Sequence, residues 1–478
     1  MVTYGSAEDE TLAFHTCAPK TTPNPRCPLR LGDSSDMRAH VTALCFGLTL
    51  FAHCAAAQTA TEDESDAVTE KRLEVLESLW DNLNRIYPAL EYKGIGGREW
   101  LEPAENRIRR ARSDAEFYDV LLEQMARLND THTRIVSYPG QPKLAPPPLQ
   151  LNQVQGKVAV MRAHPSTELS PGDIITAIGG RPADRCLSDQ LRLVCNSTER
   201  GRIREACERL LCGEPGTTVT ATVEGADGVP RVVILRREPA PKFWQEPTLS
   251  SRELGGSVGY IRIAQWHGQV SGRGIPEEFD RLLEQFKNLK GIIIDVRGNG
   301  GGDDRLADRV NGRLTDKPVV SSIDFWRKAG TTTYERTIGW VRPRGPWTYR
   351  GRAAVLIDEA SASACEHFVS GIEAMGHILL VGSPTNGAGG GPTSVTLPDG
   401  TQLRISRALG LRANGVVFEG HGIPPHIVST PTLDDLRTGR DAALEIGKEW
   451  ILSNKTVPSR FQSIDGRLPG REQIPRND

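Results

Sequence analysis

The sequence predicts a multidomain α/β protein whose C-terminal half holds a largely parallel sheet. Its 478 residues are too many for one ordinary hydrophobic core. In residues 239–452, short apolar runs alternate with helical stripes, a pattern typical of parallel α/β sheets. Helical periodicity dominates residues 58–143, whereas residues 144–238 read as short strands. These observations predict an N-terminal helical domain, an inserted β-rich domain and an α/β core.

The first 57 residues have the pattern of a leader. From Met37, Arg38 supplies a positive charge, residues 41–51 are mainly apolar, and residues 55–57 are small. This arrangement is typical of a secretory signal peptide, with cleavage expected near Ala57. We therefore expect an exported protein, periplasmic or secreted, with no membrane span after cleavage. Residues 1–36 are interpreted as a misassigned start, and a buried N-terminal helix is the alternative for residues 37–57.

Charge and cysteine content narrow the class of protein. The 58 basic and 60 acidic side chains nearly cancel, so the composition does not indicate a nucleic-acid partner, and none is predicted. After export, four cysteines remain close together, namely Cys186, Cys195, Cys207 and Cys212. In an oxidising compartment they predict two disulfides of undefined pairing. A zinc site is the alternative, which the absence of any CxxC pair disfavours.

A polar loop follows the helices of residues 58–143. Ser113 and Glu116 match a capping box, and apolar residues continue from Phe117 at helical spacing. The helix ends in Leu-Asn-Asp, and His132 lies immediately beyond it between two threonines. We therefore expect this region to present His132 on a loop.

The β-rich stretch 144–238 follows a proline-rich linker and resembles a PDZ domain. The resemblance rests on the segment 169–175, LSPGDII, followed by AIGG at 177–180. An insert at about 184–212 departs from a minimal PDZ domain and carries the four clustered cysteines. PDZ domains often bind a peptide terminus by strand addition. The expected carboxylate-binding loop is not recognisable near residues 149–157, so peptide capture and a scaffolding role both stay open.

The α/β region contains two loops that can support chemistry. Strands are expected at 259–263, 291–296, 353–357 and 378–381, and residues 453–478 are expected to form a polar tail. Ser361 and Ser363 lie between a strand and a helix, where free amides and the helix dipole stabilise an oxyanion. Helix capping by either serine is the alternative. Residues 298–302, GNGGG, follow another buried strand; the absence of a Gly-Lys-Ser/Thr disfavours a phosphate loop, and a tight turn is the other alternative.

Taken in order, these segments resemble the carboxyl-terminal processing (tail-specific) serine protease family. The matching motifs are GIIIDVRGNGGG, SASACE, VGSPTNGAGG and EGHGIPPHI, within a resemblance that covers residues 71–450. The resemblance implies a core with the fold shared by Clp protease and crotonase. It also implies that Ser363 is the nucleophile, with oxyanion amides from Ala364 and from Gly300 or Gly301.

The general base distinguishes two branches of that family. The better-known branch uses a lysine, and Ala388 stands at the matching position here. The other branch, similar to the tricorn protease core, presents a histidine from a loop ahead of the PDZ domain. This likeness implies His132 as base, Thr131 as a supporting residue and Glu419 as the carboxylate that orients the imidazole. The roles follow Ser-His-Glu triad logic with an acyl-enzyme intermediate.

The sequence therefore predicts an exported serine endopeptidase acting on protein or peptide substrates, without metal or cofactor. His367, four residues after Ser363, is the alternative base, although packing is the more common role at such a position. The alternative functions are a catalytically inactive binding protein of the same fold and crotonase-type thioester chemistry. Cleavage specificity and oligomeric state do not follow from the sequence.

Overall fold

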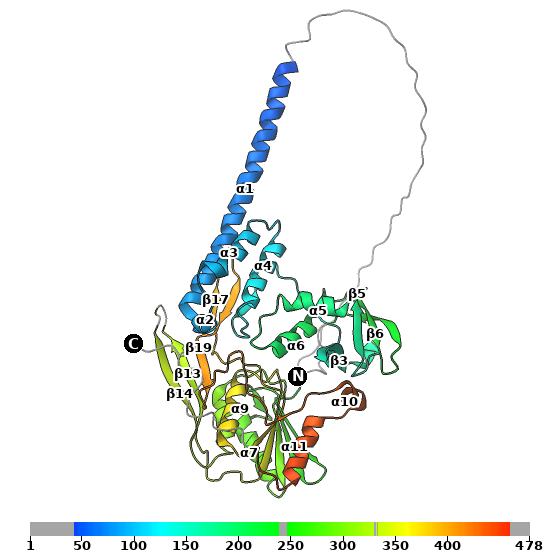
Figure 1. Cartoon of the computed structure of the whole chain (residues 1–478), viewed down its shortest axis with the longest axis vertical. Helices are drawn as coiled ribbons and strands as arrows, with labels where there is room; N and C mark the ends of the chain where they lie inside the picture. The colour runs from blue at the N-terminus through cyan, green and yellow to red at the C-terminus, as the bar shows by residue number, and fades with distance from the viewer. Residues whose placement is uncertain (1–42, 239–245, 329–330, 332, 459–478) are drawn as a thin grey trace, which may run out of the picture. The chain divides into compact units, whose positions relative to one another are not determined.

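A computed structural model describes residues 43–238, 246–328, 331 and 333–458, with side chains from Ser65 onward (Figure 1). The chain forms two compact units, residues 1–65 and residues 66–478. The expected misassigned start, the first residues of the expected signal peptide and most of the expected polar tail lie outside the described residues. Helix α1 begins at Ala43 and ends at Ile86. None of the described helices combines the length and the apolar character needed to cross a membrane.

A six-stranded, mostly parallel sheet forms the centre of the α/β region. Its strand order is β20-β16-β15-β12-β9-β8, and β8 alone pairs antiparallel with its neighbour. All four strands expected from the sequence are present in this sheet, which confirms the parallel α/β prediction. The bounds are β8 (Leu249–Leu254), β9 (Val258–Ile263), β12 (Gly291–Asp295), β15 (Arg352–Ile357), β16 (Leu379–Gly382) and β20 (Ile427–Val428).

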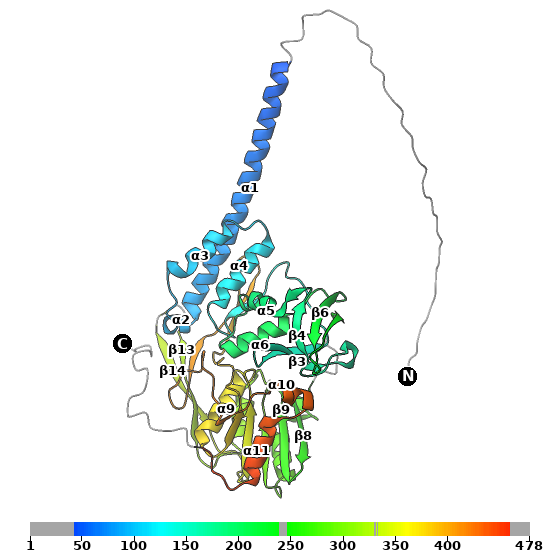
Figure 2. The same ribbon diagram turned by 45° about the vertical axis from the view of Figure 1, so that its right-hand side comes forward.

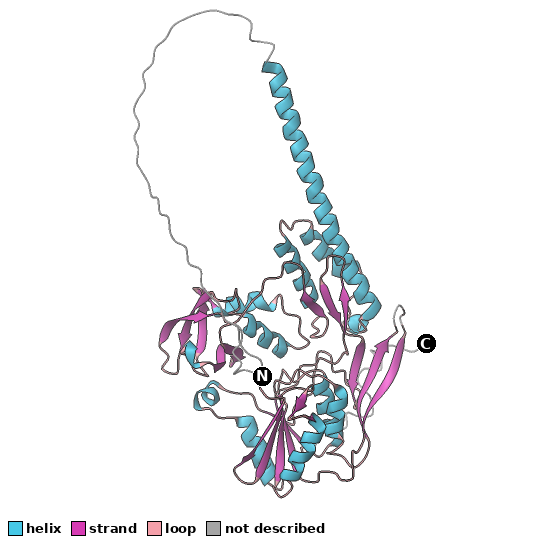
Figure 3. Ribbon diagram, turned by 180° about the vertical axis from the view of Figure 1, so that it is seen from behind, coloured by secondary structure: helices cyan, strands magenta, loops and turns pink. Residues whose placement is uncertain are grey.

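Helices cover both faces of this sheet, as Figure 3 shows. Because successive strand residues point to opposite faces, Ile292 and Ile294 pack with one group of helices and Ile293 with the other. The first group is α7 (Ile275–Gln285), α8 (Asp304–Asn311) and α9 (Ala364–Met375), and α11 (Ala442–Leu452) covers the opposite face. The short helix α10 (Leu433–Thr438) precedes α11. Burial on both faces explains the continuous apolar runs of these strands.

Smaller sheets connect the central sheet to the helices of residues 71–128. The antiparallel order β14-β13-β19 comprises β13 (Val319–Arg327), β14 (Tyr334–Val341) and β19 (Ala408–Arg412). A second set, β1-β18-β17, comprises β1 (Arg134–Ser137), β17 (Thr393–Thr396) and β18 (Gln402–Ile405). The two-residue strands β10 (Gln269–Val270) and β11 (Arg273–Gly274) form a separate hairpin. Since β1 begins two residues after His132, its pairing with β18 fixes where the histidine loop ends.

The helices before this loop share one hydrophobic core with β18 and β19. Leu76 and Leu121 lie in the same buried cluster as Leu403 and Leu409. The helices besides α1 are α2 (Ala89–Tyr92), α3 (Arg98–Ile108) and α4 (Asp114–Ala126). Ser113 caps α4 as expected, because its hydroxyl accepts from the amide of Glu116. The Glu116 carboxylate accepts from the amide of Arg112 and not from the amide of Ser113, as a capping box would require.

The β-rich stretch has the strand order β2-β3-β4-β6-β7, with β5 paired to β4. Figure 2 shows its two helices, α5 and α6, beside these strands. The insert is therefore helical. The bounds are β2 (Leu149–Val154), β3 (Lys157–Ala163), the 3-10 turn η1 (Pro165–Thr167), β4 (Ile174–Ile178), β5 (Arg181–Pro182), α5 (Ala183–Leu191), α6 (Glu199–Arg209), β6 (Thr218–Glu224) and β7 (Pro230–Arg236).

The prediction of two disulfides in this insert is wrong, because the cysteines of the described residues are all free. Cys195 and Cys207 are buried in different hydrophobic cores, the first among the helices before His132 and the second in the β-rich stretch. The Cys195 sulfur lies 3.0 Å from the Met125 carbonyl and 3.2 Å from the Asp130 carbonyl. Burial raises the pKa of this thiol to about 12, so it stays protonated and can donate to these carbonyls.

Free thiols predict a simple alkylation result. When the purified full chain is denatured in guanidinium chloride with N-ethylmaleimide and no reductant, Cys186, Cys195, Cys207 and Cys212 should all be modified. Peptide mass spectrometry of this sample and of a dithiothreitol-treated control should give the same label at each site. A pair that reacts only after reduction would contradict the observed packing.

Candidate active site

Ser363 occupies a strained turn between strand β15 and helix α9. Its backbone has φ 57° and ψ −125°, a conformation that costs a residue with a side chain about 1–3 kcal/mol. The Ser363 side chain makes no capping hydrogen bond to the helix that it precedes. Ser361 does not cap the helix either, because its hydroxyl donates to the carbonyl of Val296 at 2.9 Å. The capping alternative therefore does not explain either serine.

Three hydrogen bonds join this elbow to the glycine-rich loop after β12. The amide of Gly298 donates to the Asp358 carboxylate at 2.7 Å, and the Ser361 hydroxyl reaches Val296. The amide of Ala362 donates to the carbonyl of Asn299 at 3.0 Å. These bonds hold the backbone on both sides of Ser363 against the loop.

The glycine loop approaches Ser363 closely. A Cβ atom on Gly301 would lie 2.7 Å from the Ser363 Cβ and 3.0 Å from the Ala364 nitrogen, at a φ of 104°. A Cβ on the neighbouring Gly300 would meet no atom within 4 Å. Of these two glycines, Gly301 alone needs to be glycine for steric reasons.

Two backbone amides beside Ser363 are available for an oxyanion. Among the hydrogen bonds of the described residues, none uses the N–H of Ala364 or of Gly300. The Gly301 N–H already donates to the Asn299 side chain at 2.9 Å. The resemblance left Gly300 and Gly301 as equal candidates, and in this structure the N–H of Gly301 is already engaged by Asn299.

A buried carboxylate holds the loop on the other side of the elbow. Glu366, in the first turn of α9, accepts from the Thr385 hydroxyl at 2.5 Å and from the Gly387 and Ala388 amides at 2.7 Å each. The carbonyl of Ala388 in turn accepts from the Ser363 amide at 3.1 Å. Glu366 therefore stabilises the loop that holds the backbone of Ser363, although burial raises the pKa of this carboxyl.

The histidine loop meets the same region through Asn386. The Thr131 hydroxyl donates to the Asn386 side chain at 2.6 Å, and the Asn386 amide donates to the carbonyl of Ser361 at 2.9 Å. A single residue thus contacts both the neighbour of His132 and the elbow of Ser363.

The His132 side chain is buried, with 7% of its surface exposed, and its Nδ1 has no hydrogen-bond partner among the described residues. Burial is the main cause that lowers the pKa of His132 to about 4; Arg404, Arg134 and His367 add to the effect, and Asp130 opposes it. The imidazole is therefore neutral at pH 7 and able to accept a proton. The hydrogen bonds of the described part of the chain do not join His132 to Ser363 or to Glu419.

Asp130 fixes the backbone of the histidine loop. One of its carboxylate oxygens accepts from the amides of His132 and Thr133, both at 2.8 Å. Burial favours the neutral acid, but the Lys93 ammonium, His132 and these hydrogen bonds outweigh it and lower the pKa of Asp130. Sequence reasoning missed this residue, although its position two residues before His132 was a local signal of an Asx-type turn.

Glu419 is buried and bonded to Lys93 instead of His132. Its carboxylate accepts from the Lys93 ammonium at 2.8 Å, and the same ammonium donates to the carbonyls of Leu128 and Asn129 at 2.9 and 2.8 Å. Burial, together with Asp130, raises the pKa of Glu419 to about 8, against the lowering effect of Lys93. Lys93 thus links the expected orienting carboxylate to the segment that leads into the histidine loop. No sequence pattern identifies Lys93.

Comparisons with known proteins relate the chain to peptidases. Residues 257–429 match peptidase family S41. The chain is 26% identical over 438 residues to a Streptomyces coelicolor protein named as a tricorn protease homolog. The aligned region covers 82% of this chain and 34% of that protein. It is 24% identical over 259 residues to the carboxy-terminal processing protease CtpA of Bacillus subtilis, covering 53% of this chain and 52% of CtpA.

The solved structure of mature CPAF has the same fold, with a TM-score of 0.67 at 18% identity, covering 81% of this chain and 99% of that one. Residues 257–429 therefore match peptidase family S41, and the chain is similar to a tricorn protease homolog and to a carboxy-terminal processing protease. This confirms the resemblance drawn from the motifs. The chain spans only part of the two curated relatives, 34% of one and 52% of the other.

The two glycines of the loop provide a matched pair of variants. Gly301→Ala should destabilise the protein by about 1–3 kcal/mol. The added methyl group would displace the elbow, and the alanine backbone would have to adopt an unfavourable φ of 104°. Gly300→Ala adds the same methyl group into open space and should change the free energy of unfolding by less than about 0.5 kcal/mol. Urea unfolding of both variants measures the difference, and equal stabilities would contradict the close approach of Gly301 to Ser363.

Proposed function

We propose that the protein is an exported serine endopeptidase that hydrolyses protein or peptide substrates through an acyl-enzyme. The observation that carries the proposal is the uncapped, strained Ser363, with the amides of Ala364 and Gly300 making no hydrogen bond to any described residue. The match of residues 257–429 to peptidase family S41 supports a peptidase activity, and residues 37–57 support export. Ser363 is the nucleophile and His132 the base.

The proposed reaction is acyl transfer to Ser363 followed by hydrolysis. The Ser363 oxygen attacks the substrate carbonyl carbon while His132 takes the hydroxyl proton. The amides of Ala364 and Gly300 stabilise the negative charge that forms on the carbonyl oxygen. The C–N bond then breaks as His132 returns the proton to the leaving amine, and water hydrolyses the resulting ester by the same route. His132 and Ser363 must come into hydrogen-bond contact when substrate binds.

Glu419 has an indirect role in this proposal. We assign it to the position of the histidine loop, because it binds Lys93, which holds the carbonyls of Leu128 and Asn129. Asp130 fixes the backbone of His132 itself. Thr131, bonded to Asn386, joins this loop to the serine elbow.

The finer domain assignment is also part of the proposal. Residues 58–143 form the helical domain that presents the base, and residues 239–452 form a ClpP/crotonase-like core. Residues 144–238 form a PDZ-like domain with a helical insert. The last assignment is supported by the compact five-strand order and by the position of the LSPGDII segment at the start of β4.

Fluorophosphonate labelling tests the assignment of the catalytic residues. The folded wild-type protein should form a covalent adduct at Ser363, and Ser363→Ala should form none. His132→Ala should slow labelling and peptide hydrolysis by about three to six orders of magnitude, because the hydroxyl loses its base. His367→Ala is the matched control and should retain most of the rate.

Two outcomes would contradict this proposal. Absence of label on the wild-type protein would favour a binding protein of the same fold. A normal rate for His132→Ala, with a large loss for His367→Ala, would move the base to the first turn of α9.

The buried imidazole predicts an unusual pH profile. The lowered pKa means that His132 stays neutral, and therefore competent, well below the pH at which an exposed histidine becomes protonated. The acidic limb of kcat/KM, which reports the free enzyme, should have its midpoint near 4. The measurement needs a peptide substrate without groups that titrate between pH 3 and 8. A midpoint at or above the ordinary histidine value of about 6.5 would contradict the proposed burial of the base.

A further inference from the structure

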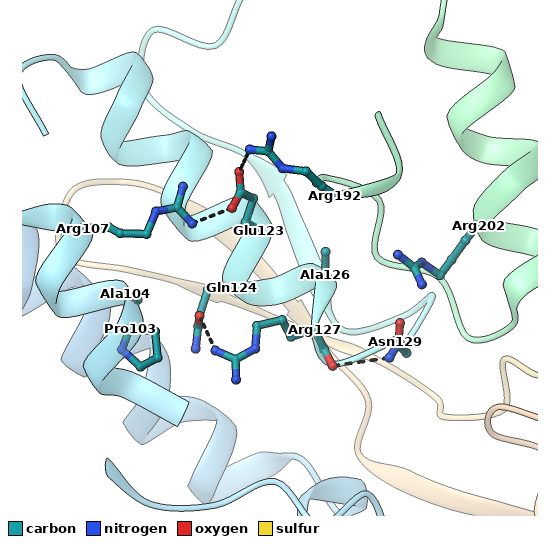
Figure 4. Close-up of a pocket in the computed structure, with 10 residues that line it drawn as sticks. All are labelled: Pro103, Ala104, Arg107, Glu123, Gln124, Ala126, Arg127, Asn129, Arg192 and Arg202. Carbon is teal, nitrogen blue, oxygen red and sulfur yellow. Dashed lines mark hydrogen bonds and ion pairs between the residues drawn. The ribbon is translucent and has the colours of Figure 1, made fainter. Parts of the chain in front are cut away.

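A basic pocket lies between helices α3 and α4 and the helical insert, apart from the elbow of Ser363 (Figure 4). It has a volume of about 550 Å³, and its charged lining residues are four arginines and one glutamate. The arginines are Arg107, Arg127, Arg192 and Arg202, and the glutamate is Glu123. The chain as a whole has a formal charge of −2, so this local excess of cations is not a consequence of composition.

Glu123 neutralises only part of this charge. One of its oxygens accepts from Arg107 at 2.5 Å and the other from Arg192, so a single carboxylate serves two guanidinium groups. Burial opposes ionisation of Glu123, but the two arginines outweigh it and lower its pKa. Asp119 also interacts with both arginines, although it makes no hydrogen bond to them among the described residues.

Arg127 and Arg202 carry the positive charge of the pocket that Glu123 does not pair with. Arg127 donates to the neutral side chain of Gln124 at 3.1 Å. Arg202 reaches the exposed Glu199 only at 3.4 Å, donates to the carbonyl of Leu191, and has a buried Nε with no hydrogen-bond partner among the described residues. A buried donor on a cation is costly to leave unbonded, so an anionic acceptor in the pocket would be stabilising.

The pocket shares two lining residues with a second pocket that includes Glu419. Arg127 and Asn129 also line a second pocket of about 390 Å³, whose other lining residues include Ser197 and Glu419. A ligand that extends from the arginines to Glu419 must be a chain. A polypeptide meets this requirement, and its carboxylates match the two-donor geometry of guanidinium groups.

We propose that this pocket binds carboxylate groups of an extended acidic polypeptide and thereby holds a substrate beside the active site. This inference rests on the proposed peptidase function, which explains why a polypeptide would bind there. The chemistry of recognition is arginine to carboxylate, supplied either by Asp and Glu side chains or by a chain terminus.

Fluorescence anisotropy tests this binding without catalysis, in a Ser363→Ala background. One fluorescein-labelled peptide of twelve residues carries three Glu residues and an amidated C-terminus. A second has Gln at those positions with a free C-terminus, and a third has Gln with an amide. The acidic peptide, the free-terminus peptide or both should bind more tightly than the neutral amide. The first two peptides distinguish side-chain from terminal carboxylates.

The double variant Arg127→Gln/Arg202→Gln should raise the Kd of the tighter peptide by roughly tenfold to a hundredfold, since two charge-assisted contacts are lost. Arg185→Gln, at an exposed arginine of α5 outside the pocket, is the matched control and should leave the Kd unchanged. In the active protein, the same double variant should raise KM for an acidic substrate with little change in kcat. Circular dichroism checks that the variants are folded.

Three results would overturn the proposal. The first is equal affinity for all three peptides, and the second is an unchanged Kd in the double variant. The third is displacement of the peptide by an equal concentration of a dT12 oligonucleotide, which would indicate a general polyanion site. Failure of the peptidase proposal has a different signature, namely normal peptide binding with no fluorophosphonate adduct on wild-type Ser363.

Discussion

The backbone conformation of Ser363 is the constraint on which the rest of the candidate site depends. A left-handed φ at a residue with a side chain is unfavourable by itself, so the surrounding contacts must maintain it. The Ser363 amide donates to the carbonyl of Ala388, and the Ala388 amide donates to the carboxylate of Glu366. Glu366 lies three residues after Ser363, so these bonds form a closed set. This closed set of bonds directs the serine away from a capping role. The close approach of Gly301 completes the enclosure on the opposite side.

Buried charge explains why the N-terminal helices are inseparable from this site. Glu419 is only 3% exposed, and a carboxylate at such a position is costly without a bonded cation. Lys93 supplies that cation, and its other donors are satisfied by carbonyls at the end of α4. The same ion pair therefore stabilises the core and sets the position of the loop that carries His132. Replacement of Glu419 would leave the Lys93 ammonium without its buried partner.

The sequence predicted those parts of the structure that depend on local patterns. The four core strands and the elbow at Ser363 could be identified because apolar runs and short motifs define them within a few residues. The sequence could not distinguish Gly300 from Gly301, because no motif reveals that the amide of Gly301 donates to the side chain of Asn299. The disulfide prediction failed because proximity in sequence does not reveal that Cys195 and Cys207 enter different cores.

Lys93 could not have been found from the sequence for a similar reason. Its partner Glu419 lies 326 positions away, and no sequence pattern predicts a contact between the two residues. Long-range charge pairs of this kind are determined by the packing of whole domains. Family resemblance indicated a carboxylate at Glu419 but did not identify the cation that binds it.

The separation between Lys93 and Glu419 also bears on the order in which the molecule is assembled. During synthesis, Lys93 emerges long before Glu419, so the early helices cannot bury the ammonium against its partner until nearly the whole chain exists. A chain that ends before residue 419 therefore lacks this ion pair, and the Lys93 ammonium that holds the carbonyls of Leu128 and Asn129 lacks its buried carboxylate partner.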